Sequence, residues 1–205
     1  MLSNKQNSTT DLGTLRRLSS KKLGFPIAQT PAEVAILKKY ARTVIKPEII
    51  VEIGTRNGGS ALVLAMNSFT AVVTIDILAD PRLSPEDNAR FGYKTPPPLK
   101  KHWARFAGGS RIEQITCPST EYSHPCSRGV GLVFIDGGHE YGEVKGDWLH
   151  FFDLVSPGGY ILLHDYEQFP GVTKFVDEDI ALPIIDRGGS IVVFQKEAND
   201  EEETD

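Results

Sequence analysis

The sequence contains only two cysteines, Cys117 and Cys126, and they do not form a Cys-x-x-Cys pair. It therefore indicates neither a disulfide framework nor a zinc knuckle. No apolar run approaches the ~20 residues that cross a bilayer, and the N-terminal segment lacks the apolar stretch of a secretory signal. Together these absences predict a cytoplasmic protein with no membrane partner.

Positive charge is also scarce, since 22 Lys and Arg residues face 27 Asp and Glu residues and give a net charge of −5. Binding to a phosphate backbone needs many basic contacts, so we expect no nucleic-acid partner. The 205-residue length suits one domain. We expect a flexible N-terminal segment over 1–23, a single domain over 24–196 and an acidic tail over 197–205.

Helix and strand patterns alternate along this domain. A helix should begin at Pro31, because Thr30 can cap it and Glu33 can complete a capping box. Apolar runs predict strands at 49–53, 71–75, 111–116, 130–135 and 160–163, separated by helical patterns at 60–65, 99–106 and 141–155. The alternation predicts an α/β fold, a doubly wound and mostly parallel seven-stranded sheet with helices on both faces.

The C-terminal part of the sheet should differ from the rest. A last helical pattern at 172–180 precedes apolar runs at 183–185 and 191–194. The short, glycine-bearing link between these two runs predicts a C-terminal antiparallel hairpin, unlike an ordinary dinucleotide-binding sheet. Upstream, the proline-rich stretch 78–98 has no periodicity, and it is either a lid over the active site or a mobile surface insertion.

A glycine-containing segment, Glu52 to Ser60, follows the first strand. Ligands of open α/β sheets bind at the carboxyl ends of strands, where Gly54 and Gly58 would permit close approach and Ser60 would offer a donor. The spacing is not Gly-x-Gly-x-x-Gly, and no Lys-Ser or Lys-Thr pair follows, which opposes a nicotinamide or a nucleoside triphosphate. Asp76 ends the next strand and could accept both hydroxyls of a ribose, or cap the following turn.

Two further carboxylates, Asp136 and Asp165, also end apolar strands. Carboxylates that face one cleft repel each other unless a proton or cation lies between them, and oxygen ligands suit Mg²⁺. His164 could be a third ligand, although imidazole is softer than Mg²⁺ usually selects. His139 could act as a base or, alternatively, cap a helix or stack near the cofactor. We expect Asp147 to be a solvated helix residue and its neighbour Trp148 a core aromatic.

These segments resemble class I S-adenosylmethionine-dependent methyltransferases. The acidic-x-Gly-x-x-x-Gly variant of their first motif occurs at Glu52 to Gly58, and the likeness runs from about Ile49 to Phe194. The Asp136 and Asp165 segments are similar to the metal-dependent O-methyltransferases related to catechol O-methyltransferase, and more closely to those that methylate sugars on macrolides and other secondary metabolites.

The resemblance implies a set of site residues. It places eight residues at S-adenosylmethionine, namely Glu52, Gly54, Thr55, Gly58, Ser60, Asp76, Ser119 and Asp136. It implies that Asp136 and Asp165 bind Mg²⁺ and that His139 and Asp136 take part in catalysis. Around Asp165 those enzymes carry an acidic pair or Asp-Asn, whereas His164 and Tyr166 flank it here, so His164 as the third metal ligand departs from the family pattern.

The expected function is Mg²⁺-assisted O-methylation of a hydroxyl on a sugar or other small metabolite. Three alternatives stay open: a nicotinamide-dependent oxidoreductase, a non-catalytic cofactor-binding module, and a metal-free methyltransferase in which His139 acts alone. A homo-oligomer is also open, because lids and N-terminal segments of such enzymes can come from a neighbouring subunit.

Overall fold

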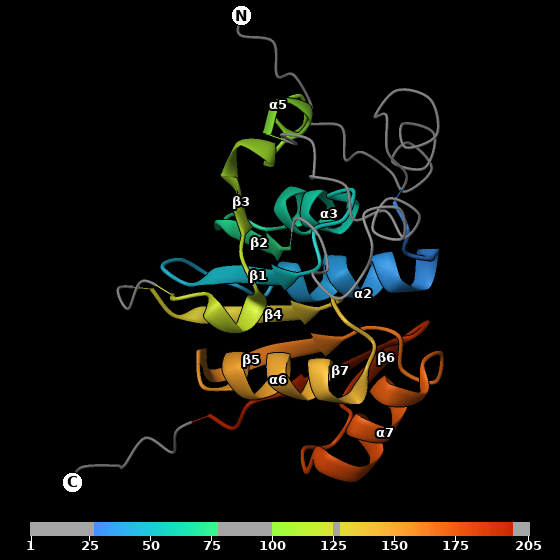
Figure 1. The fold of residues 1–205 in the computed structure, drawn as a ribbon. Helices are drawn as coiled ribbons and strands as arrows, with labels where there is room; N and C mark the ends of the chain where they lie inside the picture. Colours follow the sequence, from blue (N-terminus) through green and yellow to red (C-terminus); the bar gives the residue numbers. More distant parts are fainter. Residues whose placement is uncertain (1–26, 78–99, 125–127, 199–205) are drawn as a thin grey trace, which may run out of the picture.

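The computed structural model describes residues 27–77, 100–124 and 128–198. Within these ranges the strands form one sheet with the order β3-β2-β1-β4-β5-β7-β6 (Figure 1). The strands are β1 Ile49–Ile53, β2 Val72–Asp76, β3 Ile112–Thr116, β4 Val130–Ile135, β5 Val155–Leu163, β6 Asp186–Gly188 and β7 Ile191–Gln195. The first five strands are parallel and β7 runs antiparallel to β5 and β6, which confirms the predicted sheet and its terminal hairpin.

Helices cover both faces of the sheet. They are α2 Pro31–Ala41, α3 Gly59–Asn67, α5 Lys100–Trp103, α6 Tyr141–Phe152 and α7 Pro170–Asp179, with short 3₁₀ turns at Gly109–Arg111 and Ser119–Glu121. One core lies between α2, α3 and one side of the sheet, and the other lies between α6, α7 and the opposite side. Because side chains alternate along a strand, Ile50 and Val51 belong to different cores.

The start of α2 forms as predicted. Glu33 N donates to Thr30 Oγ1 at 3.4 Å, and Thr30 N donates to Glu33 Oε2 at 2.7 Å. The two residues thus form a capping box that satisfies two donors at the helix end. Its position matters for the site, because the second carboxylate oxygen of Glu33 is then directed to Ser190, just before β7.

Several predicted boundaries are wrong. The strand expected at 183–185 lies three residues later, at β6, and Ile184 and Ile185 are 42% and 45% exposed. Helix α6 ends at Phe152, so Val155 belongs to β5, and the helix expected over 99–106 is limited to α5.

The N-terminal segment 1–23, the whole of the 78–98 stretch and most of the acidic tail lie outside the described residues. Over the residues that are described, no helix has the length and apolar character needed to cross a bilayer.

Candidate active site

A glycine corner lies where β1 leads into α3. Gly54 has φ 98° and Gly58 has φ 70°, in the left-handed region that favours glycine. A Cβ atom on Gly54 would overlap the carbonyl oxygen of Asp136, because the loop is packed against the end of β4. The backbone conformation at both positions therefore favours the predicted glycines.

Three buried polar side chains support this loop from below. Thr55 Oγ1 lies 2.7 Å from Thr74 Oγ1, which donates to Glu52 Oε2 at 2.5 Å. Glu52 is fully buried, and burial raises its pKa to about 8 although hydrogen bonds from Ser60 and Thr74 act in the opposite direction. The side chains of Glu52 and Thr55 thus brace the corner and are not exposed to a ligand in this state.

Asp76, at the end of β2, faces the same loop. Its Oδ2 accepts from Arg56 N at 2.7 Å, and its Oδ1 accepts from Ile77 N at 2.8 Å. Burial raises its pKa, while these backbone N–H groups lower it. Asp76 therefore points toward the glycine corner, as ribose binding requires, and it also caps the turn at Ile77.

Ser119 follows β3, and its hydroxyl donates to Asp147 Oδ1 on α6. The prediction that Asp147 is a solvated residue is wrong, because it is only 5% exposed and burial raises its pKa to about 6. The expected core position of Trp148 is confirmed. The Asp147 side chain thus fixes the loop on which Ser119 stands.

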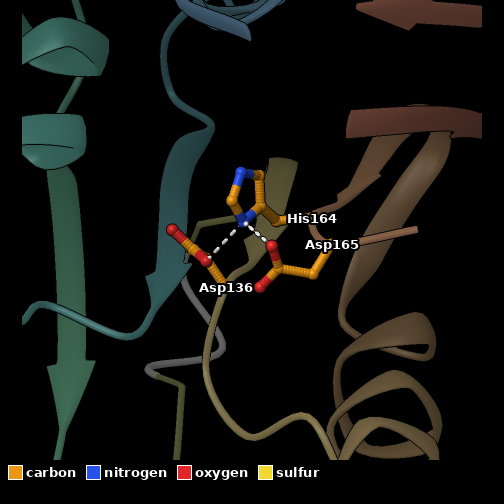
Figure 2. Close-up of side chains that lie close together, drawn as sticks. All are labelled: Asp136, His164 and Asp165. Carbon is orange, nitrogen blue, oxygen red and sulfur yellow. Dashed lines mark ion pairs between the residues drawn. The ribbon is translucent and has the colours of Figure 1, made fainter. Parts of the chain in front are cut away.

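The ends of β4 and β5 bring together the three predicted metal ligands (Figure 2). His164 Nδ1 lies 2.9 Å from Asp136 Oδ1 and 3.1 Å from Asp165 Oδ1. One ligand atom from each residue lies within 4.8 Å of the others. Both ring nitrogens of His164 are buried, and neither makes a hydrogen bond of good geometry with the described residues. Such convergence of donors on one point is what a cation site requires.

The charges of this cluster are strongly coupled. Burial opposes a charged imidazole, but the close approach of the Asp136 and Asp165 carboxylates and their negative charges outweigh it and raise the pKa of His164 to about 10. Burial raises the pKa of Asp136, with His164 opposing it. Burial would also raise the pKa of Asp165, but His139 and His164 hold it well below its usual range. Without a cation, a protonated His164 compensates the two carboxylates.

His139 stands at the open side of the cluster. Its Nε2 lies 2.8 Å from Asp165 Oδ2, and its ring stacks on Phe169 with 4.1 Å between centroids. The hydrogen bond to Asp165 is the main reason that its pKa is raised. Its side chain is 43% exposed, so a substrate can reach it. The alternative that His139 caps the helix is wrong, because Glu140 is the N-cap residue of α6.

Three residues at the site were not anticipated as site residues. Gln29 Nε2 donates to Asp136 Oδ2 at 2.9 Å, Glu33 Oε1 lies 3.5 Å from His164 Nε2, and Phe169 stacks on His139. Glu33 carried a sequence signal, but for helix capping. Gln29 and Phe169 carried none, because their contacts join elements far apart in the chain.

With the geometry in view, comparison with known proteins assigns the family. A family model described as "Methyltransferase domain" matches residues 51–166. The chain belongs to this methyltransferase family. An uncharacterized protein of Acanthamoeba polyphaga mimivirus, R132, is 30% identical over 156 residues, which are 69% of this chain. The methyltransferase spans 65% of that relative's length.

Solved structures share the fold of this methyltransferase. The O-methyltransferase NovP has a TM-score of 0.64 at 18% identity, with 84% of each chain covered. TomG of Streptomyces achromogenes, an O-methyltransferase of tomaymycin synthesis solved with S-adenosylmethionine, has 0.58 at 16%, with 90% of this chain and 88% of TomG covered. The methyltransferase PaMTH1 of Podospora anserina, solved with S-adenosylhomocysteine, has 0.57 at 18%, with coverage of 83% and 80%. The predicted class I methyltransferase fold is confirmed.

Proposed function

We propose that this methyltransferase transfers the methyl group of S-adenosylmethionine to a hydroxyl of a sugar or other small metabolite, assisted by a divalent cation for which Mg²⁺ was the expectation from sequence. The observation that carries the proposal is the position of two polar clusters at the carboxyl edge of one sheet. The Gly54 corner with Asp76 forms one cluster, and Asp136, His164 and Asp165 form the other.

The glycine corner suits the cofactor. Main-chain groups at Gly54 and Gly58 can approach the amino-acid end of S-adenosylmethionine, because glycine carries no side chain of its own. Asp76 supplies two carboxylate oxygens for the ribose hydroxyls, at present held by backbone N–H groups. Ser119 lies on the loop after β3, where it would flank the adenine.

The donors at the second cluster fit a cation. Asp136 Oδ1, Asp165 Oδ1 and His164 Nδ1 converge, and His164 Nδ1 has no hydrogen bond of its own. When bound, S-adenosylmethionine supplies the methyl group and the cation lowers the pKa of the acceptor hydroxyl and fixes its direction. His139 donates Nε2–H to Asp165 Oδ2, which leaves the lone pair of Nδ1 to accept the hydroxyl proton. Asp165 thereby fixes the tautomer of the base.

Calorimetry with S-adenosylhomocysteine tests the cofactor site directly. The parent protein should bind at one site, and Asp76→Ala should bind more weakly, while Asp153→Asn on the exposed end of α6 should match the parent. Absence of binding by the parent protein would reject the proposal. Transfer of a labelled methyl group to a panel of hydroxylated compounds, with and without chelator, then tests the reaction.

The same assays separate the alternatives. Methyl transfer that survives chelation would indicate the metal-free reaction at His139. Binding without transfer to any acceptor would indicate a non-catalytic module. A nicotinamide oxidoreductase is opposed by the family match and by the antiparallel β7, since the ordinary dinucleotide-binding sheet continues in parallel.

A further inference from the structure

Each of the three converging residues offers one atom to the centre and has its other polar atom facing a separate partner. Asp136 turns Oδ1 inward while Oδ2 accepts from Gln29 Nε2 at 2.9 Å. Asp165 turns Oδ1 inward while Oδ2 faces His139 Nε2 at 2.8 Å. An accidental cluster of polar residues would not be expected to divide its atoms in this way.

His164 follows the same arrangement. Its Nδ1 faces the two carboxylates, and its Nε2 lies 3.5 Å from Glu33 Oε1. Glu33 is itself held firmly, because Oε2 accepts from Thr30 N and Oε1 accepts from both Ser190 N and Ser190 Oγ. A histidine that ligates a metal usually directs its second ring nitrogen to a carboxylate or carbonyl, which fixes the ring and its tautomer. Glu33 is in the place of that carboxylate.

We propose that His164 is a true ligand, positioned by Glu33, and that the site therefore selects a divalent transition-metal ion over Mg²⁺. The inference rests on the proposed cation-assisted function and deepens it. Imidazole binds first-row transition ions well, whereas Mg²⁺ favours oxygen ligands and gives up its water reluctantly. A site made only for Mg²⁺ has no need of a buried imidazole between its carboxylates.

The choice of probes follows from the order of affinities. Mn²⁺ is the weakest-binding first-row divalent ion at a given nitrogen and oxygen site, and Co²⁺ binds more tightly. If Mn²⁺ already binds more tightly than Mg²⁺, the first-row ions that bind more tightly than Mn²⁺ should also do so. Calorimetric titration of the whole chain with Co²⁺, Mn²⁺ and Mg²⁺ should give affinities in that order, with Mn²⁺ tighter than Mg²⁺ by about tenfold or more.

Pulsed electron paramagnetic resonance on the Mn²⁺ complex gives a readout that is independent of activity. The parent protein should show coupling between Mn²⁺ and an imidazole ¹⁴N nucleus. His164→Asp should abolish this coupling and reverse the preference toward Mg²⁺, because it replaces the nitrogen with oxygen. His150→Asn removes a histidine on α6 that lies 2.9 Å from the Tyr122 carbonyl and packs on the Phe151 ring, and it should leave coupling and affinities unchanged.

Glu33→Gln tests the positioning role. It keeps an oxygen acceptor for the capping box but replaces the carboxylate that faces His164. Loss of a group that orients a metal-binding histidine typically weakens metal binding about 10- to 100-fold. Circular dichroism and S-adenosylhomocysteine binding at parental values would show that the variant is folded. If Glu33→Gln then bound Mn²⁺ as the parent does, Glu33 would have no positioning role.

The remaining outcomes distinguish the inference from the proposed function. Mn²⁺ binding without ¹⁴N coupling, or equal affinities for Mn²⁺ and Mg²⁺, would overturn the inference and leave a cation-assisted enzyme. If no divalent ion bound while S-adenosylhomocysteine did, both the inference and the cation in the proposed function would be rejected. Failure to bind S-adenosylhomocysteine would reject the proposed function by itself.

Discussion

The two ends of the site are constructed in different ways. The glycine corner, proposed to bind the cofactor, depends on the left-handed backbone at Gly54 and Gly58, with Glu52, Thr55 and Thr74 buried beneath it. The second corner, proposed to bind the cation and the acceptor, is formed by Asp136, His164 and Asp165, whose side chains converge from the ends of β4 and β5 and face residues before and within α2. Substitutions should therefore affect the first corner through backbone geometry and the second through individual polar atoms.

The sharpest test of this contrast is His139→Ala. Loss of a general base typically lowers turnover about 10²- to 10⁴-fold, or about 3–5 kcal/mol in the barrier. S-adenosylhomocysteine affinity should stay at the parental value, because the cofactor corner does not depend on this side chain. Steady-state kinetics and calorimetry would check this, with His150→Ala as a control histidine. Parental turnover in the His139 variant would remove the base from the proposal.

Gly54→Ala should damage the cofactor corner and the fold together. The left-handed backbone costs an alanine roughly 1–2 kcal/mol, and the new Cβ would displace the carbonyl of Asp136. We expect a total loss near 3 kcal/mol in the free energy of unfolding. Gly158→Ala is the matched control, because Gly158 has φ 78° with nothing within 4 Å of its Cβ position. If urea unfolding gave equal losses of unfolding free energy for the two variants, backbone strain alone would account for the effect at Gly54.

Asp76→Asn tests a cofactor residue that would act through its side chain. Hydrogen bonds to a charged group contribute about 1.5–3 kcal/mol, so S-adenosylhomocysteine affinity should fall about 10- to 100-fold. Cation binding at Asp136 and Asp165 should not change. An unaltered affinity for S-adenosylhomocysteine would mean that Asp76 only caps its turn.

Glu52→Gln should change how stability depends on pH. The pKa of Glu52 is raised to about 8 in the folded state, so the unfolded chain loses this proton near pH 4.5 and the folded chain keeps it. This group therefore favours folding at low pH, and its contribution decreases as pH rises from about 4.5 to about 8, by about 1.4 kcal/mol per pH unit. The variant lacks this ionisable group, so its free energy of unfolding should rise relative to that of the parent as pH increases over that range.

Urea unfolding of the Glu52→Gln variant at several pH values between 5 and 8 would measure the gain. The exposed Glu121→Gln should follow the parent throughout. Parallel profiles for the parent and the Glu52 variant would show that the buried carboxyl does not titrate differently from its unfolded form.

Local signals predicted most of the fold. The capping box at Thr30 and Glu33 and the strand-ending carboxylates Asp76, Asp136 and Asp165 depend on neighbours in sequence, and the structure has them where they were expected. The edge strand β6 was misplaced because its residues, Asp186 to Gly188, have little strand propensity. Pairing with β7 determines their conformation instead.

The outer part of the site could not be predicted in the same way. Gln29 reaches Asp136 across 107 positions of the chain, and Ser190 reaches Glu33 across 157. Asp147 has the sequence pattern of a solvent-facing helix residue, but it is buried because the Ser119 hydroxyl lies against it. Such pairings arise from tertiary packing, which no periodicity encodes. His139 lies near Asp136 in sequence, yet its pairing with Asp165 depends on the meeting of two strands.

Gly54 packs directly against the main-chain carbonyl of Asp136, so the two corners of the site are in contact through a single peptide group. Backbone handedness and packing against the end of β4 both forbid a side chain at this point. A single nucleotide change in that codon would therefore disturb both polar clusters at once, because it moves the residue that carries Asp136 Oδ1 together with the glycine loop.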